Sequence, residues 1–442
     1  MSTSRQTFFT FLNKGMLSVV SLVNSILLAH LLLPGDRGFF QATQTYSTTG
    51  TAVVGGYTGY YAYALSRDPD EAVPTVQMGN LFVFGLSLLT LGVVFALRHL
   101  VFAHIPAMWW WAAICLPVAF IYNYGTKILQ GLNQISWLNR ANNAQPLLFF
   151  AACVVLFLMR HRLSDASRLS LTYYLWISSY LVAAVFTMWI SYLLVRHRQS
   201  IAWKFHGKNW RGTVDYGGWL SVSNGVNYVN YRIDFWFVQW LCTPKILSVY
   251  GIAVAASEVL VHISTSVSSV VFKRMTGAER SDAITLTEAA TRQTVLSSIL
   301  VAILMYAFFP ALILVAFPKV YAGAVLPFCI LLPGLIARAA RNLIIQYATN
   351  QLANPKTAIW MNGVSILINA LFCVILVPTF KGVGGAIAST VSYIISYAIY
   401  IVWFSRVNHV SPVGLLRVKK SDWAPYLAVW NRLYRMTRLS RT

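Results

Sequence analysis

Long apolar segments divide the chain at nearly regular intervals, with short polar linkers between them. A helix of about 20 apolar residues is long enough to cross the hydrocarbon core of a bilayer. The pattern therefore predicts twelve membrane-spanning helices, at 12–33, 39–64, 76–97, 108–129, 143–159, 171–195, 214–240, 248–271, 293–316, 323–348, 357–377 and 383–404. The longest linker, 272–291, has room for a small surface helix and no more.

The composition supports a polytopic membrane protein. Of the 442 residues, 57% are hydrophobic and 10% are charged, whereas a soluble domain carries about 25% charged residues. A soluble all-α protein with a very apolar core is the less favoured alternative. The five cysteines are scattered and follow no metal-binding or disulfide spacing, which indicates buried, inert thiols. The first apolar segment lacks a small-residue cleavage site, so we expect it to be the first span.

The charge distribution predicts an orientation. A net charge of +22 would suggest nucleic acid as the partner of a soluble protein. Here the basic residues lie between apolar segments, so we expect contact with anionic membrane lipids and no nucleic acid. If the linkers alternate, 23 of the 34 Lys and Arg residues lie on the side of the N-terminus and 8 on the other side. The bias predicts that both termini are cytoplasmic.

A repeat divides the spans into two halves. Pro34 follows span one and Phe40 opens the next segment, just as Pro244 follows span seven and Tyr250 opens the next one. Because each half has an even number of helices, the halves share one orientation. The predicted fold is an all-α membrane protein with two parallel six-helix lobes, 1–200 and 201–404, around a central cavity. A basic cytoplasmic tail, 405–442, carries aromatic residues suited to the headgroup surface.

Ionisable residues within the spans are few. Span seven contains Arg232 and Asp234, which lie about 200° apart around a helix and so cannot simply pair with each other. Asp234 extends a polar stripe that includes Asn227 and Asn230. Arg232 requires another partner, and Glu258 on span eight is the obvious candidate. The pair is either a structural tie or part of a functional site.

Span ten carries a cationic stripe, whereas the first lobe offers neutral polar groups. Arg338, Arg341 and Asn342 share a face of span ten, and Lys14 lies near the inner end of span one. Gln41, Gln44 and Thr48 form a stripe on span two. Arginines suit a phosphate, and amides and hydroxyls suit sugar hydroxyls. The same stripe would also serve simple helix–helix hydrogen bonding.

These residues define the predicted site. Its cationic substrate-binding groups are Arg232, Arg338, Arg341 and Lys14, and its candidate coupling or ion-pairing acids are Asp234 and Glu258. The polar lining is expected from Asn227, Asn230, Gln41, Gln44, Thr48 and Asn342. No catalytic, metal-binding or ATP-binding motif occurs, so we expect a transporter rather than an enzyme. It would have no cofactor, and an ion gradient or the membrane potential would drive uphill transport.

Four stretches resemble a known family. They are ILLAHLLLPGDRGFF, ILQGLNQISWLNRANNAQPLL, YRIDFWFVQWLCTPKILSVYGIAVAASE and NQLANPKTAIWMNGVSILINALFCVILVPTFKGVGGAIASTVSY. In this order they resemble Wzx-like polysaccharide-unit flippases. These belong to the polysaccharide synthesis transporter branch of the multidrug/oligosaccharidyl-lipid/polysaccharide exporter (MOP) superfamily. The chain departs from the pattern at Ser248, where the repeat usually has glycine. It also lacks a first-lobe acid within the spans.

The resemblance implies a fold and a function. The fold would be MATE-like, with a V-shaped cavity and alternating access. The substrate would be an undecaprenyl-pyrophosphate-linked oligosaccharide, moved from the inner to the outer leaflet of the bacterial cytoplasmic membrane for exopolysaccharide or O-antigen synthesis. A polysaccharide polymerase and glycosyltransferases would be partners. The alternatives are a multidrug or metabolite antiporter of the same fold and, less favoured, a membrane polymerase or ligase acting on lipid-linked sugar.

Overall fold

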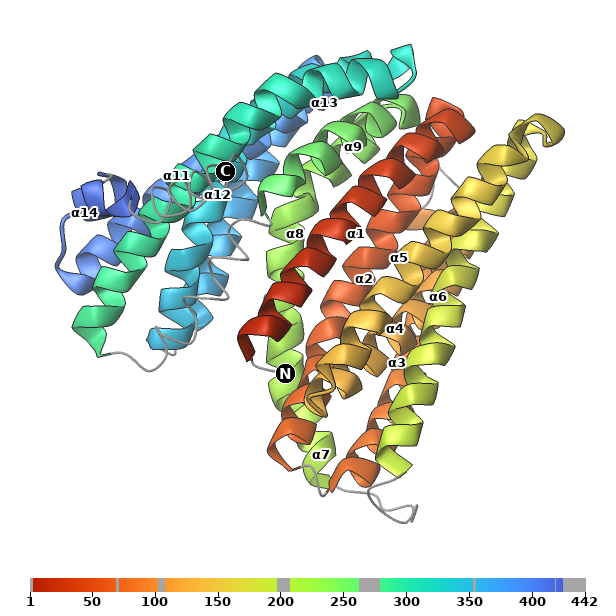
Figure 1. Ribbon diagram of the computed structural model, residues 1–442, viewed down its shortest axis with the longest axis horizontal. Coiled ribbons are helices and arrows are strands. Elements are labelled where there is room, and N and C mark those ends of the chain that lie inside the picture. Colours follow the sequence, from red (N-terminus) through yellow and green to blue (C-terminus); the bar gives the residue numbers. More distant parts are fainter. Residues whose placement is uncertain are drawn as a thin grey trace, which may run out of the picture.

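The computed structural model describes residues 3–68, 71–101, 108–196, 207–261, 279–352, 355–417 and 419–423 (Figure 1). Throughout these ranges the regular structure is helical, with no strand. Three sequence predictions fall outside the described part: the inner end of span eight, the side chain of Lys14, and the tail beyond residue 423.

The first lobe consists of six helices, coloured red to yellow in Figure 1. They are α1 (Thr3–Leu31), α2 (Pro34–Arg67), α3 (Ala72–Val101), α4 (Met108–Gly131), α5 (Ile135–Leu158) and α6 (Asp165–Arg196). A single 3₁₀ turn, Arg160–Arg162, joins α5 to α6. Pro117 lies inside α4 and Pro146 inside α5, and membrane helices tolerate such prolines because other groups can satisfy the freed backbone carbonyl.

The second lobe begins with a short helix, α7 (Gly207–Gly212), which continues through a π-helical turn into α8 (Gly218–Leu241). It continues with α9 (Pro244–Ser257), α11 (Arg280–Ala316), α12 (Val325–Gln346) and α13 (Pro355–Asn408). A 3₁₀ turn at Glu258–Leu260 extends α9, another at Lys319–Ala324 precedes α12, and a π-helical turn at Tyr347–Gln351 follows α12. After α13 the chain forms α14 (Val413–Leu416) and a last turn, Lys420–Trp423.

The long α13 is two antiparallel arms. They meet at Lys381, which has a φ of 54° in the left-handed region. Gly384 lies so close to the carbonyl of Leu376 that a side chain there would collide with it. Further along the arms, the Asn369 side chain donates to Ser389 Oγ at 3.4 Å. The arms correspond to predicted spans eleven and twelve, so the all-α fold with about twelve spans is confirmed.

Six helices in the described part are long and apolar enough to cross a membrane by length and composition. They are Ala72–Ala96, Ile135–Leu158, Asp165–Arg196, Arg280–Ala316, Lys319–Thr349 and Ile359–Asn408. Helices α2 and α8 are more polar because each carries stripes of polar residues that face the other lobe or a cavity between the lobes. The long apolar helices make the protein a multi-pass membrane protein.

The repeated prolines begin helices. The sequence suggested that each proline ends a helix and that the aromatic residue six positions later opens the next. In the structure, Pro34 and Pro244 are themselves the first residues of α2 and α9. Proline suits this position because its fixed φ is helical and its missing N–H has no partner there anyway. The two repeats thus place α2 and α9 in equivalent positions of the two lobes.

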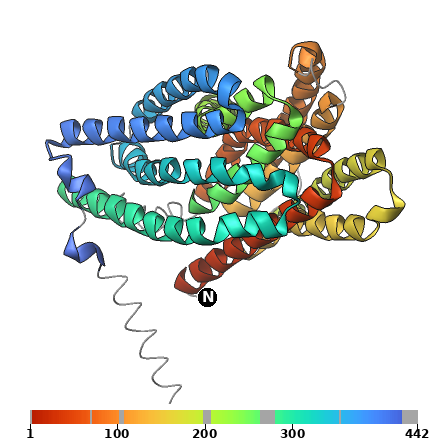
Figure 2. The ribbon, with the colours of Figure 1, turned by 90° about the horizontal axis from the view of Figure 1, so that it is seen from above.

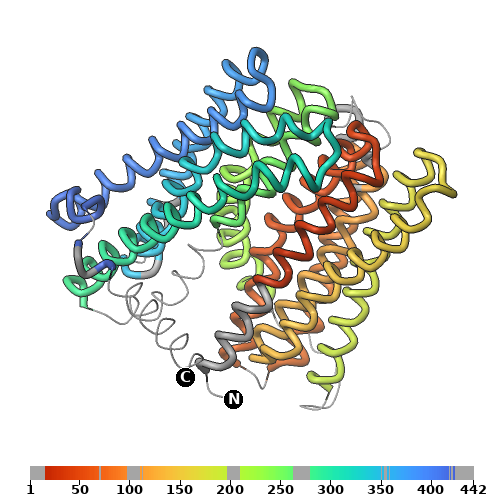
Figure 3. Tube along the Cα trace, turned by 45° about the horizontal axis from the view of Figure 1, so that its top comes forward, coloured from red at the N-terminus to blue at the C-terminus, as the bar shows by residue number. Residues whose placement is uncertain are grey.

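The lobes meet along α2, which packs against both α8 and α9. At the end of the molecule where α1 ends and α2 and α9 begin, α1 also approaches α11, and His30 Nε2 lies 2.9 Å from the carbonyl oxygen of Ala316. We call this the closed end. Toward the other end, where α1 begins, the helices of the two lobes lean apart (Figures 1 and 3). Figure 2 shows that α1 and α11 lie side by side near the closed end and diverge from each other with distance from it.

Candidate functional site

A cavity of about 730 Å³ lies between the lobes. Its walls come from α1, α2, α5 and α6 on the first-lobe side and from α8, α9, the turn after α9, and α11 on the second-lobe side. The volume falls in the range of about 300–1,000 Å³ that is typical of small-molecule sites. The fold therefore provides the central cavity that the sequence predicted.

The second-lobe wall contains an ion pair. Arg232 Nη1 lies 2.8 Å from Glu258 Oε1, and each side chain is 21% exposed. The guanidinium also lies over the ring of Tyr231, 4.5 Å from its centroid. The pairing expected from helical geometry is present, because Arg232 projects from α8 toward the turn that follows α9. Its Nε is buried without a hydrogen-bond partner, so the arginine retains a free donor.

The polar side chains that the structure describes in the first-lobe wall are uncharged. Gln41, Gln44 and Thr48 all line the cavity, as the stripe on span two predicted. Thr48 Oγ1 also hydrogen-bonds Tyr228 on α8, so the stripe takes part in contact between the lobes as well. The cavity and helix–helix interpretations of this stripe therefore both hold.

Asp234 and Asn230 lie outside the lining of this cavity. Asp234 is 4% exposed and accepts a hydrogen bond from the hydroxyl of Tyr250 on α9. Asn230 is also buried and donates to the carbonyl of Asn362 on α13 at 3.0 Å. The face of α8 that carries them packs inside the second lobe, while Arg232 faces the cavity. Asn230 therefore does not contact this cavity in the structure, and its role as a lining residue stays a prediction.

The two arginines of α12 lie behind the cavity wall. Arg338 packs over the ring of Tyr231, 3.8 Å from its centroid, so Tyr231 contacts both Arg232 and Arg338. Arg341 is 1% exposed and donates to Ser396 Oγ at 2.9 Å and Ser365 Oγ at 3.4 Å, both on α13. Neither arginine is part of the lining described above. Direct contact with substrate stays a prediction for both residues.

The remaining predicted residues are dispersed. Asn227 is exposed on α8 and Asn342 is half-buried on α12, and neither lines the cavity. The side chain of Lys14 is outside the described part. The described residues contain no group of three or more His, Cys, Asp or Glu side chains that could hold a metal ion.

Sequence reasoning missed Arg37, which it counted as a linker cation. Arg37 is 3% exposed. It donates to the carbonyl of Ser248 at 3.0 Å, to Ser248 Oγ at 3.2 Å and to Ser25 Oγ at 2.8 Å. Its guanidinium lies 5.3 Å from the centroid of the Tyr321 ring. The repeat was the sequence signal that could have indicated this contact, since Arg37 and Ser248 lie in the two matching segments that begin α2 and α9.

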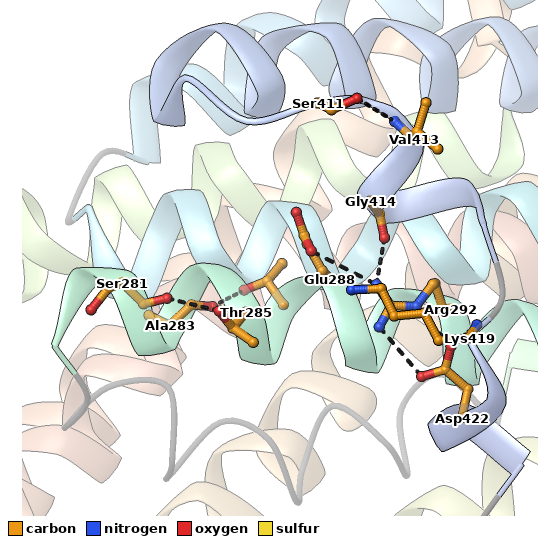
Figure 4. Close-up of polar contacts among 11 residues, drawn as sticks. Ser281, Ala283, Thr285, Glu288, Arg292, Ser411, Val413, Gly414, Lys419 and Asp422 are labelled. Carbon is orange, nitrogen blue, oxygen red and sulfur yellow. Dashed lines mark hydrogen bonds and ion pairs between the residues drawn. The ribbon is translucent and has the colours of Figure 1, made fainter.

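A second polar cluster lies on the part of α11 that is remote from the closed end (Figure 4). Arg292 on α11 contacts Asp422 at 2.8 Å, Glu288 at 3.8 Å and the carbonyl of Gly414. Burial opposes ionisation of Asp422, but hydrogen bonds from Arg292 and from the Lys419 amide outweigh it and hold the pKa of this carboxyl below its ordinary value. The cluster fastens the segment after α13 to α11.

Comparison with known proteins identifies the fold. A family model described as "Polysaccharide biosynthesis protein" matches residues 166–326. An inward-facing multidrug resistance MATE family transporter of the MOP superfamily is 13% identical, with coverage of 89% of this chain and 94% of that chain and a TM-score of 0.72. The lipid II flippase MurJ, in an inward closed conformation, is 13% identical, with coverage of 96% and 93% and a TM-score of 0.71.

The chain has the MOP superfamily fold. The polysaccharide biosynthesis family match runs from α6 into α12 and agrees with the resemblance seen in the sequence. An outward-facing MATE transporter of the MOP superfamily is also similar, with 13% identity, coverage of 92% and 95%, and a lower TM-score of 0.59. No curated protein matches the chain. This fold explains why the site lies between the two lobes.

Proposed function

We propose that the protein moves an undecaprenyl-pyrophosphate-linked oligosaccharide from the inner to the outer leaflet of the bacterial cytoplasmic membrane. The observation that carries this proposal is the cavity between the lobes, which combines a neutral amide and hydroxyl wall with an arginine. Such a cavity suits a headgroup that is sugar at one end and phosphate at the other. The family match and the likeness to a lipid II flippase support a lipid-linked substrate.

Transport would proceed by alternating access between the lobes. The excess of Lys and Arg on the side of the N-terminus supports cytoplasmic termini and therefore places the closed end at the outer face. With this orientation the lobes would lean apart toward the cytoplasm, and the conformation described above would be inward-facing. Headgroup binding at the cytoplasmic side would precede opening of the contacts at the closed end.

The phosphate-binding group is Arg232 in this proposal. Its free Nε is a donor for a phosphate oxygen, and binding would weaken its pairing with Glu258. Arg338 and Arg232 both contact the Tyr231 ring, so Arg338 would add positive charge close to the bound phosphate. We assign Arg341 mainly to holding α12 against α13, because both of its hydroxyl partners are on α13.

The energy source would be an ion gradient or the membrane potential. Asp234 is the buried acid that we propose for coupling, because it lies on α8 and bonds Tyr250 on α9, a helix that also contacts the first lobe. Protonation would weaken its hold on Tyr250. An Asp234→Asn variant should keep an acceptor for Tyr250 while losing gradient-driven transport, measured in vesicles with and without an imposed pH gradient.

A deletion strain tests the proposed function. Lipid-linked repeat units should accumulate at the cytoplasmic face, and surface polysaccharide should be lost. Arg232→Ala should fail to restore export while inserting normally, and the exposed-loop variant Arg162→Ala serves as its control. Unchanged surface polysaccharide in the deletion strain would rule the proposal out. Neighbouring genes for glycosyltransferases and a polymerase would provide the expected partners.

A multidrug antiporter is the second candidate, favoured by the fold it shares with MATE transporters. Transporters of cationic drugs favour acidic cavities, whereas the acid in the described lining, Glu258, is already paired with Arg232. Direct efflux measurements with cationic dyes separate the two functions, because the flippase should leave dye accumulation unchanged.

A further inference from the structure

The first-lobe wall of the cavity contains more carboxamide groups than the span-two stripe alone. Asn24 on α1 and Gln145 on α5 join Gln41 and Gln44 of α2 in the lining. These side chains come from three different helices, so they surround one space rather than follow a single helix face. A carboxamide can both donate and accept hydrogen bonds, as can a sugar hydroxyl or an acetamido group.

Two of these amides retain hydrogen-bonding capacity. Asn24 Oδ1 and Gln41 Oε1 are buried and accept no hydrogen bond from the protein. A buried acceptor without a donor is costly, so such atoms in a cavity wall point to a ligand that supplies the donor. Gln145 is already oriented by the hydrogen bond that its Nε2 donates to Ser179 Oγ on α6 at 3.2 Å.

The charge of the wall limits the ligand further. Arg232 and Glu258 are the charged residues in the described lining, and they pair with each other on the second-lobe side. In the proposed function Arg232 is committed to the pyrophosphate. A carboxylate on the sugar would then lie against uncharged amides, with no counter-cation among the described lining residues, and burying an unpaired charge is expensive.

We propose that Asn24, Gln41, Gln44 and Gln145 form a subsite for an uncharged sugar, hydroxylated or N-acetylated, and that this subsite discriminates against acidic sugars. The inference rests on the proposed function, because the sugar is taken to be attached to the lipid pyrophosphate held at Arg232. It goes further by assigning the class of glycan and the residues that select it.

The test measures binding of three synthetic lipids to the purified full-length protein in nanodiscs. They are undecaprenyl pyrophosphate alone, the same lipid carrying N-acetylglucosamine, and the same lipid carrying glucuronic acid. We expect N-acetylglucosamine to tighten binding about tenfold relative to the bare lipid, equivalent to about 1.4 kcal/mol. Glucuronic acid should give no gain.

Variants assign the gain to the wall. Gln41→Leu and Asn24→Leu should each remove most of the advantage of N-acetylglucosamine and leave binding of the bare lipid unchanged. Gln346→Leu is the matched control, because Gln346 Oε1 is likewise buried without a partner but does not line the cavity. This variant should keep the full advantage.

The outcomes separate this inference from the proposed function. If the bare lipid binds but glucuronic acid binds as tightly as N-acetylglucosamine, or if both cavity variants keep the advantage, the subsite assignment is wrong and the flippase proposal stands. If none of the three lipids binds to the wild-type protein, both are wrong.

Discussion

Arg37 of the first lobe donates to both the carbonyl and the hydroxyl oxygen of Ser248 in the second lobe, at 3.0 and 3.2 Å. The same guanidinium bonds Ser25, which lines the cavity. The contact therefore lies directly at the closed end of the cavity. Opening at this end requires these hydrogen bonds to break, so Arg37 is placed to control access.

Replacing Arg37 by Ala should open the closed end more often. Hydrogen bonds to charged groups contribute about 1.5–3 kcal/mol each, so losing this set should raise access to the cavity at least about tenfold. Access can be measured by labelling a Ser21→Cys variant from outside with a membrane-impermeant maleimide. Cys242 and Cys329 are first replaced by Ser because both are partly exposed.

The control for this prediction is Arg162→Ala. Arg162 is exposed in the turn between α5 and α6, at the same end of the molecule. It should leave labelling at the wild-type rate. Equal labelling of the Arg37→Ala and wild-type proteins would show that other contacts hold the closed end shut.

Two adjacent glycines in α2 should respond differently to alanine. A Cβ atom at Gly56 would lie 2.1 Å from the backbone nitrogen of Ser221 in α8, whereas one at Gly55 would meet nothing within 4 Å. Gly56→Ala must therefore push the lobes apart, at a cost of about 1–3 kcal/mol. Gly55→Ala should be neutral or stabilise by up to about 1 kcal/mol, because alanine favours helix. Thermal unfolding of the purified variants measures the difference, and equal melting temperatures would contradict the packing.

Exchanging the two charges of the cavity pair, Arg232 and Glu258, should reduce stability less than reversing either charge alone. Glu258→Arg or Arg232→Glu places two like charges together, which should cost about 1–3 kcal/mol in a partly exposed site and abolish export. The double exchange restores opposite charges and should recover stability. Recovery of stability without export would assign the pair a substrate-binding function, and recovery of both would assign it to structure.

The exposed pair Arg168–Asp165 provides the comparison for that cycle. Its atoms lie 2.9 Å apart, but the Asp165 side chain is 53% exposed. Surface pairs of this kind contribute about 0–1 kcal/mol. Reversing either charge there should change the melting temperature little. A change as large as that at the cavity pair would show that the effect of charge reversal does not depend on the location of the pair.

The sequence predicted the fold well because span length and charge bias are set by the bilayer, which acts on every helix in the same way. It also predicted the pairing of Arg232 with Glu258, since helical geometry leaves Asp234 on another face. The burial of Arg341 against Ser365 and Ser396 was not predictable, because it depends on which face of α12 packs on α13. Hydropathy alone also placed Arg37 in a linker, although tertiary contacts bury it.

The tie between Arg292 and Asp422 gives the last prediction. The two side chains are 4% and 3% exposed and lie 2.8 Å apart, so Asp422 holds the segment after α13 on α11. Asp422→Asn should loosen this segment at neutral pH by removing the charge that Arg292 binds. Hydrogen exchange of the peptide 411–423 should show protection reduced severalfold. Glu279→Gln, which neutralises an exposed acid before the same helix, should leave it unchanged.

The pH dependence of this tie has a definite sign. Because the pKa of Asp422 is lowered in the folded protein, its stabilising contribution is complete above the ordinary aspartate value of about 3.9 and disappears as the pH falls through the lower folded value. Protection of the wild-type segment, corrected for intrinsic exchange, should therefore stay constant from pH 7 to about 4 and then fall toward that of Asp422→Asn. A loss of protection already between pH 7 and 5 would mean that a different group holds the segment in place.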